Sequence, residues 1–145
     1  MAAGAWNFYN NAKKHLMDGT IDLDSHTFRM QLHTSASNAA TLTLSTVGAV
    51  TNQVAEQFGY SSSGKALTGV TWGVGASASE MRFDCTAVVW TAAGGSISAV
   101  KYAVIFDVTG GLLLCYSQLS AAQFSVTSGN TLTITPSANG IFELN

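Results

Sequence analysis

The chain has 145 residues, of which 47% are hydrophobic and only 10% are charged, and its formal net charge is -2. This length suits one domain with a real core, and high hydrophobicity with little charge argues against intrinsic disorder. The sequence has no basic stripe that would neutralise phosphates and no apolar run of about 18–20 residues, so neither nucleic acid nor a membrane is an expected partner.

The first ordered segment is predicted to be a helix over residues 7–17. Trp6 and Tyr9 lie three residues apart, a spacing that places them on one helical face. Asp18-Gly19 is expected to end the helix, because glycine suits a left-handed C-cap. Residues 1–19 would thus form an N-terminal arm and helix. Residues 1–10 lack a basic region followed by a long apolar stretch, so we expect no signal peptide and synthesis in a cytoplasm, with retention there or release by lysis.

Alternating apolar residues after the helix predict strands. Ile21 and Leu23 alternate with polar residues, as do Phe28, Met30 and Leu32. The pattern fits two short strands or one long strand kinked at residues 24–25. Residues 42–50 fit either a short strand or a single helical turn. Residues 51–65 form the longest predicted loop, which is either a contact surface or a flexible connector.

Later strands follow one another with glycine-rich turns between them. One is predicted over residues 67–72, and a long second one runs from Met81 to Trp90 with Met81, Phe83, Cys85, Ala87 and Val89 on one face. A third covers residues 99–107, and residues 112–119 are apolar on both faces, which predicts a central strand. Short strands are expected at residues 123–126, 131–135 and 141–144, and Pro136 ends the second of these.

Seven to nine strands that do not alternate with helices predict an all-β fold. We expect a single domain over residues 1–145: an antiparallel β-sandwich, jelly-roll-like, at residues 20–145, with one short N-terminal helix. The small charge also favours burial against neighbouring subunits, because fewer ions must lose their hydration.

No catalytic, cofactor-binding or metal-binding residue is predicted. Asp18, Asp22 and Asp24 superficially resemble a calcium loop, but the twelfth position holds Arg29 where an EF-hand needs glutamate, so turn carboxylates are expected. The three histidines are spread over helix, turn and strand, and His26 and His33 would point to opposite faces of a strand. The glycine-rich residues 69–75 precede no helix that could bind an anion.

The two cysteines, Cys85 and Cys115, lie 30 positions apart among apolar neighbours. They are expected to be buried free thiols, and a disulfide between neighbouring strands is the alternative.

Aromatic residues are the candidates for partner contact. Trp6, Phe8 and Tyr9 precede the predicted strands and either cap one end of the fold or anchor a partner, and Tyr60 lies in the long loop. Trp72 and Trp90 end strands, where their rings either pack at the core rim or lie on a sugar or a neighbouring subunit.

Four segments, in order, resemble small structural proteins of tailed bacteriophages. They are FYNNAKKHLMDGTIDLDSHTFRMQLHTS (residues 8–35), GYSSSGKALTGVTW (59–72), VKYAVIFDVTGG (100–111) and ANGIFEL (138–144). The resemblance implies a virion component without catalytic residues, in the role of a jelly-roll cement or decoration protein on the capsid exterior. Its implied partners are the major capsid protein and further copies of itself, as a dimer or trimer.

The alternatives differ in place or in class. The protein would be a tail or fibre component of the virion, or a carbohydrate-binding module that stacks sugars on Trp72, Trp90 or Tyr60. A hydrolase is the least favoured hypothesis, because no acid, base and nucleophile come together in the sequence.

Overall fold

The structure, a computed structural model, describes Met1 and residues 3–145. Its regular elements are antiparallel β-strands joined by many turns and loops, with a single short α-helix, α1 (Asn10–Met17), and a turn of 3-10 helix, η1 (Val47–Ala49). The prediction of an all-β fold with one short N-terminal helix is confirmed. The jelly-roll arrangement stays a prediction.

The largest sheet has five strands. Their order is β1 (Trp6–Phe8), β9 (Leu112–Gln118), β8 (Tyr102–Asp107), β2 (Phe28–His33) and β3 (Lys65–Ala66). As predicted, β9 is internal to a sheet. Residues 103–106 of β8 and 113–115 of β9 are all buried, because both faces of the sheet centre are covered.

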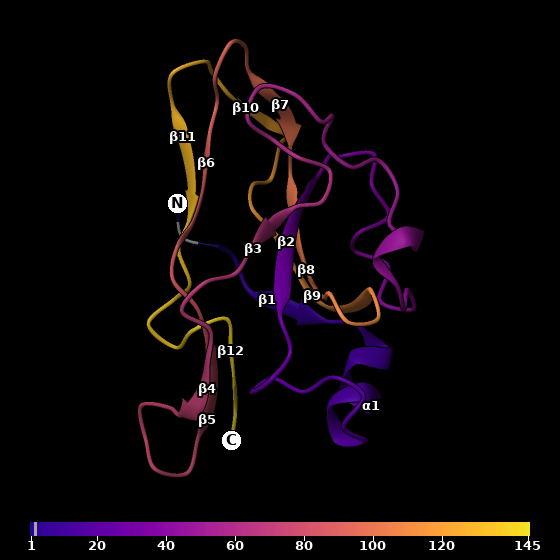
Figure 1. Ribbon diagram of the computed structural model, residues 1–145, viewed down its shortest axis with the longest axis vertical. Coiled ribbons are helices and arrows are strands. Elements are labelled where there is room, and N and C mark those ends of the chain that lie inside the picture. The colour runs from indigo at the N-terminus through magenta and orange to yellow at the C-terminus, as the bar shows by residue number, and fades with distance from the viewer. Residues whose placement is uncertain (2) are drawn as a thin grey trace.

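Two of the three smaller sheets lie along one side of the five-stranded sheet, and the third lies above it at the top of the view (Figure 1). One has the order β12 (Phe142–Leu144), β5 (Met81–Asp84) and β4 (Thr71–Val74). A two-stranded sheet pairs β6 (Val88–Thr91) with β11 (Thr131–Ile134), and another pairs β7 (Ile97–Val100) with β10 (Phe124–Val126). α1 and η1 lie on the opposite side of the five-stranded sheet (Figure 1).

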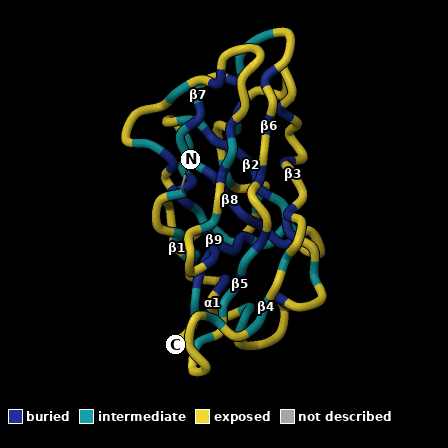
Figure 2. The backbone as a smooth tube through the Cα atoms, turned by 90° about the vertical axis from the view of Figure 1, so that its left-hand side faces the viewer, coloured by how far each residue is buried: buried dark blue, intermediate teal, exposed yellow. Residues whose placement is uncertain are grey.

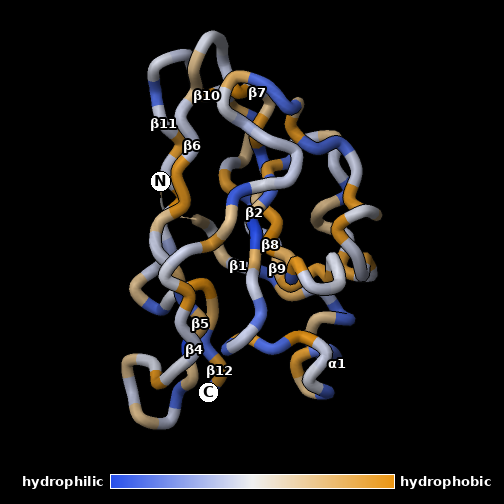
Figure 3. The backbone as a smooth tube through the Cα atoms, viewed as in Figure 1, coloured by the Kyte–Doolittle hydropathy of each residue, from blue (hydrophilic) through white to orange (hydrophobic). Residues whose placement is uncertain are grey.

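Aromatic contacts join these layers. Phe28 of β2 and Phe83 of β5 have ring centroids 5.2 Å apart, and Tyr9, just before α1, lies 5.7 Å from Tyr116 of β9. Buried residues follow the strands through the middle of the molecule and exposed residues follow the loops (Figure 2). Hydrophobic residues are concentrated in the same strands (Figure 3). The core therefore lies on both faces of the five-stranded sheet.

The N-terminal arm differs from its prediction. Residues 6–8 form β1, which pairs with β9 in the register Trp6↔Ser117 and Phe8↔Cys115, and the helix begins only at Asn10. The arm is thus an edge strand of the main sheet, not a part separate from residues 20–145.

The predicted strand at Ile21 and Leu23 is wrong. Both side chains are buried, but residues 18–26 form turns in which the Asp18 and Asp22 carboxylates accept backbone N–H groups. Local hydrogen bonds to aspartate compete with a strand ladder, and here they prevail.

The long strand predicted over residues 81–90 is also wrong. It divides into β5 and β6, which belong to different sheets. Between them Thr86 is tied to Thr68, with its N–H 2.9 Å from the Thr68 carbonyl oxygen. The buried positions shift by one residue across this break, so Phe83 and Val88 are buried whereas Val89 is exposed. The strand predicted over residues 67–72 is wrong for residues 67–70, which form no strand, and its last two residues begin β4. The strand predicted over residues 99–107 is interrupted at Lys101, between β7 and β8, and the described residues hold twelve strands.

Candidate functional site: polar network, aromatic residues and an apolar end

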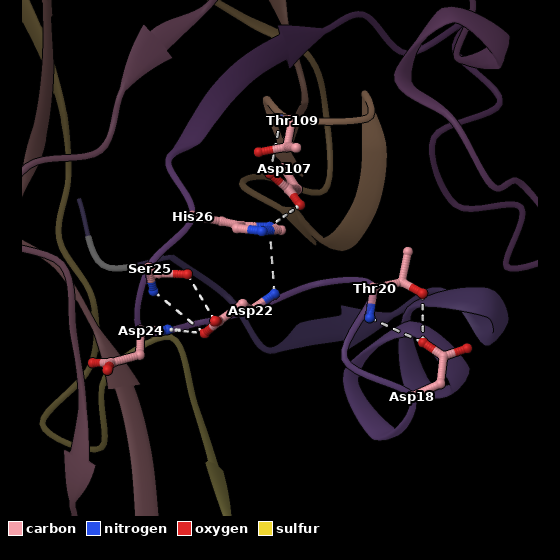
Figure 4. A network of polar contacts seen from close by, with 8 residues as sticks. All are labelled: Asp18, Thr20, Asp22, Asp24, Ser25, His26, Asp107 and Thr109. Carbon is pink, nitrogen blue, oxygen red and sulfur yellow. Dashed lines mark hydrogen bonds and ion pairs between the residues drawn. The ribbon is translucent and has the colours of Figure 1, made fainter.

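A buried carboxylate organises the most concentrated polar network. Asp107, at the end of β8, is fully buried, and its Oδ2 atom lies 2.7 Å from Nδ1 of His26 (Figure 4). Its other oxygen accepts the backbone N–H of Thr109 at 2.9 Å. Nδ1–H of His26 donates to Asp107, which fixes the orientation of the imidazole.

Two further aspartates stabilise the turns beside this pair (Figure 4). Asp18 accepts the hydroxyl and the N–H of Thr20, and Asp22 accepts the hydroxyl of Ser25 and the N–H of Asp24. These hydrogen bonds lower the pKa of both carboxyl groups. The prediction of turn carboxylates is confirmed for both residues.

The hydrogen bonds of this network tie turns and a strand end together. Nδ1 of His26 donates to the Asp107 carboxylate, and the Asp22 backbone nitrogen lies 3.4 Å from the same ring atom. Within the described residues, no hydroxyl or thiol forms a hydrogen bond with the His26 imidazole, as the serine, threonine or cysteine of a histidine-activated pair would. In Met1 and residues 3–145 no three histidine, cysteine or carboxylate side chains gather as metal ligands would.

His33 is buried in β2, away from this network. Its Nδ1 donates to the Thr51 carbonyl oxygen at 3.2 Å, and its Nε2 meets no hydrogen-bond partner from the described residues. Burial lowers the pKa of His33 from 6.5 to about 4, so the imidazole is neutral at pH 7.

The structure does not bring the four predicted partner-binding residues to one surface. Tyr9 is fully buried and donates its hydroxyl to the Ala39 carbonyl oxygen at 2.6 Å. Burial raises the pKa of this phenol. Trp6 and Phe8 are half-buried in β1, and the Phe8 ring packs on Phe142 with a centroid distance of 4.5 Å.

Tyr60 likewise points into the protein. It is 3% exposed, and its hydroxyl accepts the Leu32 N–H at 2.9 Å and Nε2 of Gln53 at 2.8 Å. Desolvation raises the pKa of Tyr60. The Tyr60 hydrogen bond to Leu32 therefore attaches loop 51–64 to β2, an attachment that a flexible connector would lack.

The two tryptophans that end predicted strands have different surroundings. Trp90 is 1% exposed, so its ring is a core group and has no face free for a sugar. Trp72 is half-buried, 6.2 Å from the Phe142 ring, and it borders an open hollow of about 310 Å³. The walls of this hollow come from the end of α1, the following turn and the three-stranded sheet: Leu16, Met17, Gly19, Ile21, Asp22, Leu23, Trp72 and Leu144.

Exposed apolar side chains surround this end of the molecule. Val74, Met81 and Leu144 face one another across β4, β5 and β12, and they are 63%, 36% and 38% exposed. Met17, at the end of α1, is 79% exposed. A single exposed apolar residue is ordinary, but a cross-strand row of them beside an apolar hollow is a candidate contact surface. Sequence reasoning missed this surface, because Met81 alternates with Phe83 like a core residue and Val74 lies within the glycine-rich residues 69–75.

Both cysteines are free and buried, as expected. Burial raises the pKa of the Cys85 thiol to about 11 and that of Cys115 well above its usual value. Neither thiol is activated as a nucleophile, since activation lowers the pKa of a thiol.

No helix in the described residues has the length and apolar character needed to cross a bilayer. Comparisons with protein-family models, curated proteins and solved structures found no match to this chain.

Proposed function

We propose that the protein is a structural component of a tailed-phage virion: a capsid cement or decoration protein, without enzymatic activity, that binds the assembled lattice of the major capsid protein. The resemblance of its four ordered segments supports this role. Those segments contain α1 and β2, then β3, β8 and β12, so they include three of the five strands of the largest sheet.

The observation that carries the proposal is the contrast between polar and apolar groups. The Asp107–His26 pair and the tyrosine hydroxyls at positions 9 and 60 hold strands and turns together. In contrast, the apolar side chains of Val74, Met81 and Leu144 lie outside the core and are exposed at the surface. An exposed apolar row beside a hollow is a candidate site for contact with a neighbouring protein.

A capsid lattice suits contacts of modest strength. Many copies bound to a repeating array gain effective concentration, and a ligand that binds only the assembled lattice stabilises it by mass action.

Cosedimentation tests the role. Purified protein is mixed with assembled capsid shells and, separately, with unassembled capsid subunits of the phage that encodes it. We expect saturable binding to shells and far weaker binding to subunits. No binding to shells, with gold-labelled antibody found at the tail of intact particles, would replace this proposal by the tail or fibre alternative.

The carbohydrate-binding alternative depends on Trp72, because Trp90 and Tyr60 are buried. A glycan array with the wild-type protein and Trp72→Ala tests it, and wild-type binding that the substitution abolishes would favour this alternative.

A further inference from the structure

The outer edge of β4 has unpaired backbone groups. β4 pairs with β5 alone, in the register Gly73↔Arg82 and Val74↔Met81. The Gly75 N–H donates to the Glu80 carbonyl oxygen at 2.9 Å, so Gly75 and Glu80 form a hydrogen-bonded pair, and this fixes which of the other cross-strand pairs are hydrogen-bonded. Because hydrogen-bonded pairs alternate along antiparallel strands, Gly73 bonds inward to β5 while the N–H and C=O groups of Trp72 and Val74 point outward. None of the hydrogen bonds formed by the described residues uses these outward groups.

Apart from its short length of four residues, β4 has no feature that protects this edge. Natural edge strands are protected by lysine, proline or a bulge, and β4 reads Thr-Trp-Gly-Val with a regular register. Open edges of this kind accept another strand.

We propose that β4 pairs antiparallel with β4 of a second copy, about a twofold axis at Gly73, to join two three-stranded sheets into one. The outward-pointing residues make this edge self-complementary. With Gly73 opposite its own copy, Trp72 lies opposite Val74 of the other chain, and about four backbone hydrogen bonds form around the axis.

The side chains fit this pairing on both faces. Trp72 and Val74 share one face of the sheet with the row Met81 and Leu144, so the exposed Val74 side chain would pack beside the second Trp72. On the other face Gly73 meets its own copy, and a Cβ atom built there has nothing within 4 Å.

Charges do not oppose the pairing. Arg82 lies beside Gly73 on β5. The two Arg82 residues would be three strand spacings of about 4.8 Å apart, beyond the Debye length of about 10 Å at 0.1 M salt. This inference is independent of the virion role, because the edge would pair copies in free solution.

An edge-blocking variant tests the pairing. Val74→Pro removes an outward N–H and leaves the bonds of Gly73 to β5 intact. The matched control is Val89→Pro, since the Ala92 N–H bond to the Asn130 carbonyl oxygen makes Val89 point outward from β6 in the same way. We expect sedimentation equilibrium to show a wild-type dimer, at least about tenfold weaker association for Val74→Pro, and no change for Val89→Pro. A wild-type monomer at the highest soluble concentration, or equal weakening by both substitutions, would overturn the proposal.

A cysteine at the axis provides a second measurement that does not depend on loss of stability. Gly73→Cys would place two thiols in a non-hydrogen-bonded pair, with Cβ atoms about 4.5–5.5 Å apart. Gly48→Cys is the control, because a Cβ atom there also meets nothing within 4 Å. Under mild oxidation we expect Gly73→Cys to form a covalent dimer at least about tenfold faster than Gly48→Cys, owing to the higher effective concentration. Equal rates would contradict the axis at Gly73. Failure of wild-type protein to bind capsid shells would contradict the proposed function and leave these two results unaffected.

Discussion

Nδ1 of His26 lies 2.7 Å from Oδ2 of Asp107, and this contact joins the turn before β2 to the end of β8, 81 residues further along the chain. The backbone strengthens the junction, because the Val108 N–H donates to the Thr27 carbonyl oxygen at 3.0 Å. The imidazole is partly exposed whereas the carboxylate is fully buried. The pair therefore acts as a polar contact at the end of the central sheet.

Replacing Asp107 is expected to destabilise the fold. Asp107→Ala leaves the His26 and Thr109 donors without their acceptor, which costs about 2–3 kcal/mol of unfolding free energy. Asp107→Asn keeps an acceptor for Thr109 and is expected to cost less. Urea unfolding measures both, with Asp24→Ala on the neighbouring exposed turn as the control, expected within about 0.5 kcal/mol of wild type. An equal effect of Asp107→Ala and Asp24→Ala would contradict the structural role of the pair.

Stability is expected to fall in mild acid because of His33. Its pKa is about 4 in the folded protein and near 6.5 when unfolded, so the unfolded chain takes up the proton first as the pH falls. The contribution of the neutral imidazole is complete above pH 6.5 and is lost between pH 6.5 and about 4, up to about 3 kcal/mol. His33→Gln should remove this loss. The carboxylates titrate in both proteins, so parallel curves of unfolding free energy against pH would rule out the assignment to His33.

The two buried tyrosine hydroxyls are expected to stabilise the fold by different amounts. Tyr9→Phe removes one hydrogen bond and leaves the Ala39 carbonyl unpaired, at about 1–2 kcal/mol. Tyr60→Phe removes contacts to both Leu32 and Gln53 and should cost more. Thermal unfolding of both variants checks the order. If either tyrosine instead binds a partner, its variant would lose shell binding with no change in stability.

The cysteines are expected to react only when the protein opens. With a pKa of about 11 for Cys85 and a pKa well above its usual value for Cys115, little thiolate exists at pH 8, and both cysteines are buried. Labelling by a thiol reagent should thus follow the unfolding equilibrium and accelerate in urea. Rapid stoichiometric labelling of the folded protein at pH 8 would refute this burial.

The sequence predicted those elements whose pattern arises from their own residues. β2 and β9 appeared with nearly correct bounds, because Phe28, Met30 and Leu32 alternate and residues 112–119 are apolar on both faces. β1 was missed, since three residues are too few to show a period and its partner β9 lies about 110 residues away. The break between β5 and β6 was missed because the tie between Thr68 and Thr86 depends on tertiary structure.

Less of the candidate functional site than of the fold could be predicted from the sequence. Local sequence correctly indicated turn carboxylates at Asp18 and Asp22, but it could not pair His26 with Asp107 across 81 residues. Aromatic residues also do not reveal their burial: Tyr9 and Tyr60 fill the core, whereas Val74, which resembles a core residue, is exposed. Burial is decided by which strands become neighbours, and that depends on the whole chain.

Quantitative mass spectrometry of purified particles tests the central claim most directly. For a phage that encodes this chain, we expect the protein to be present at a copy number comparable to that of the major capsid protein. A few copies per particle, or none, would contradict its assignment as a capsid decoration protein.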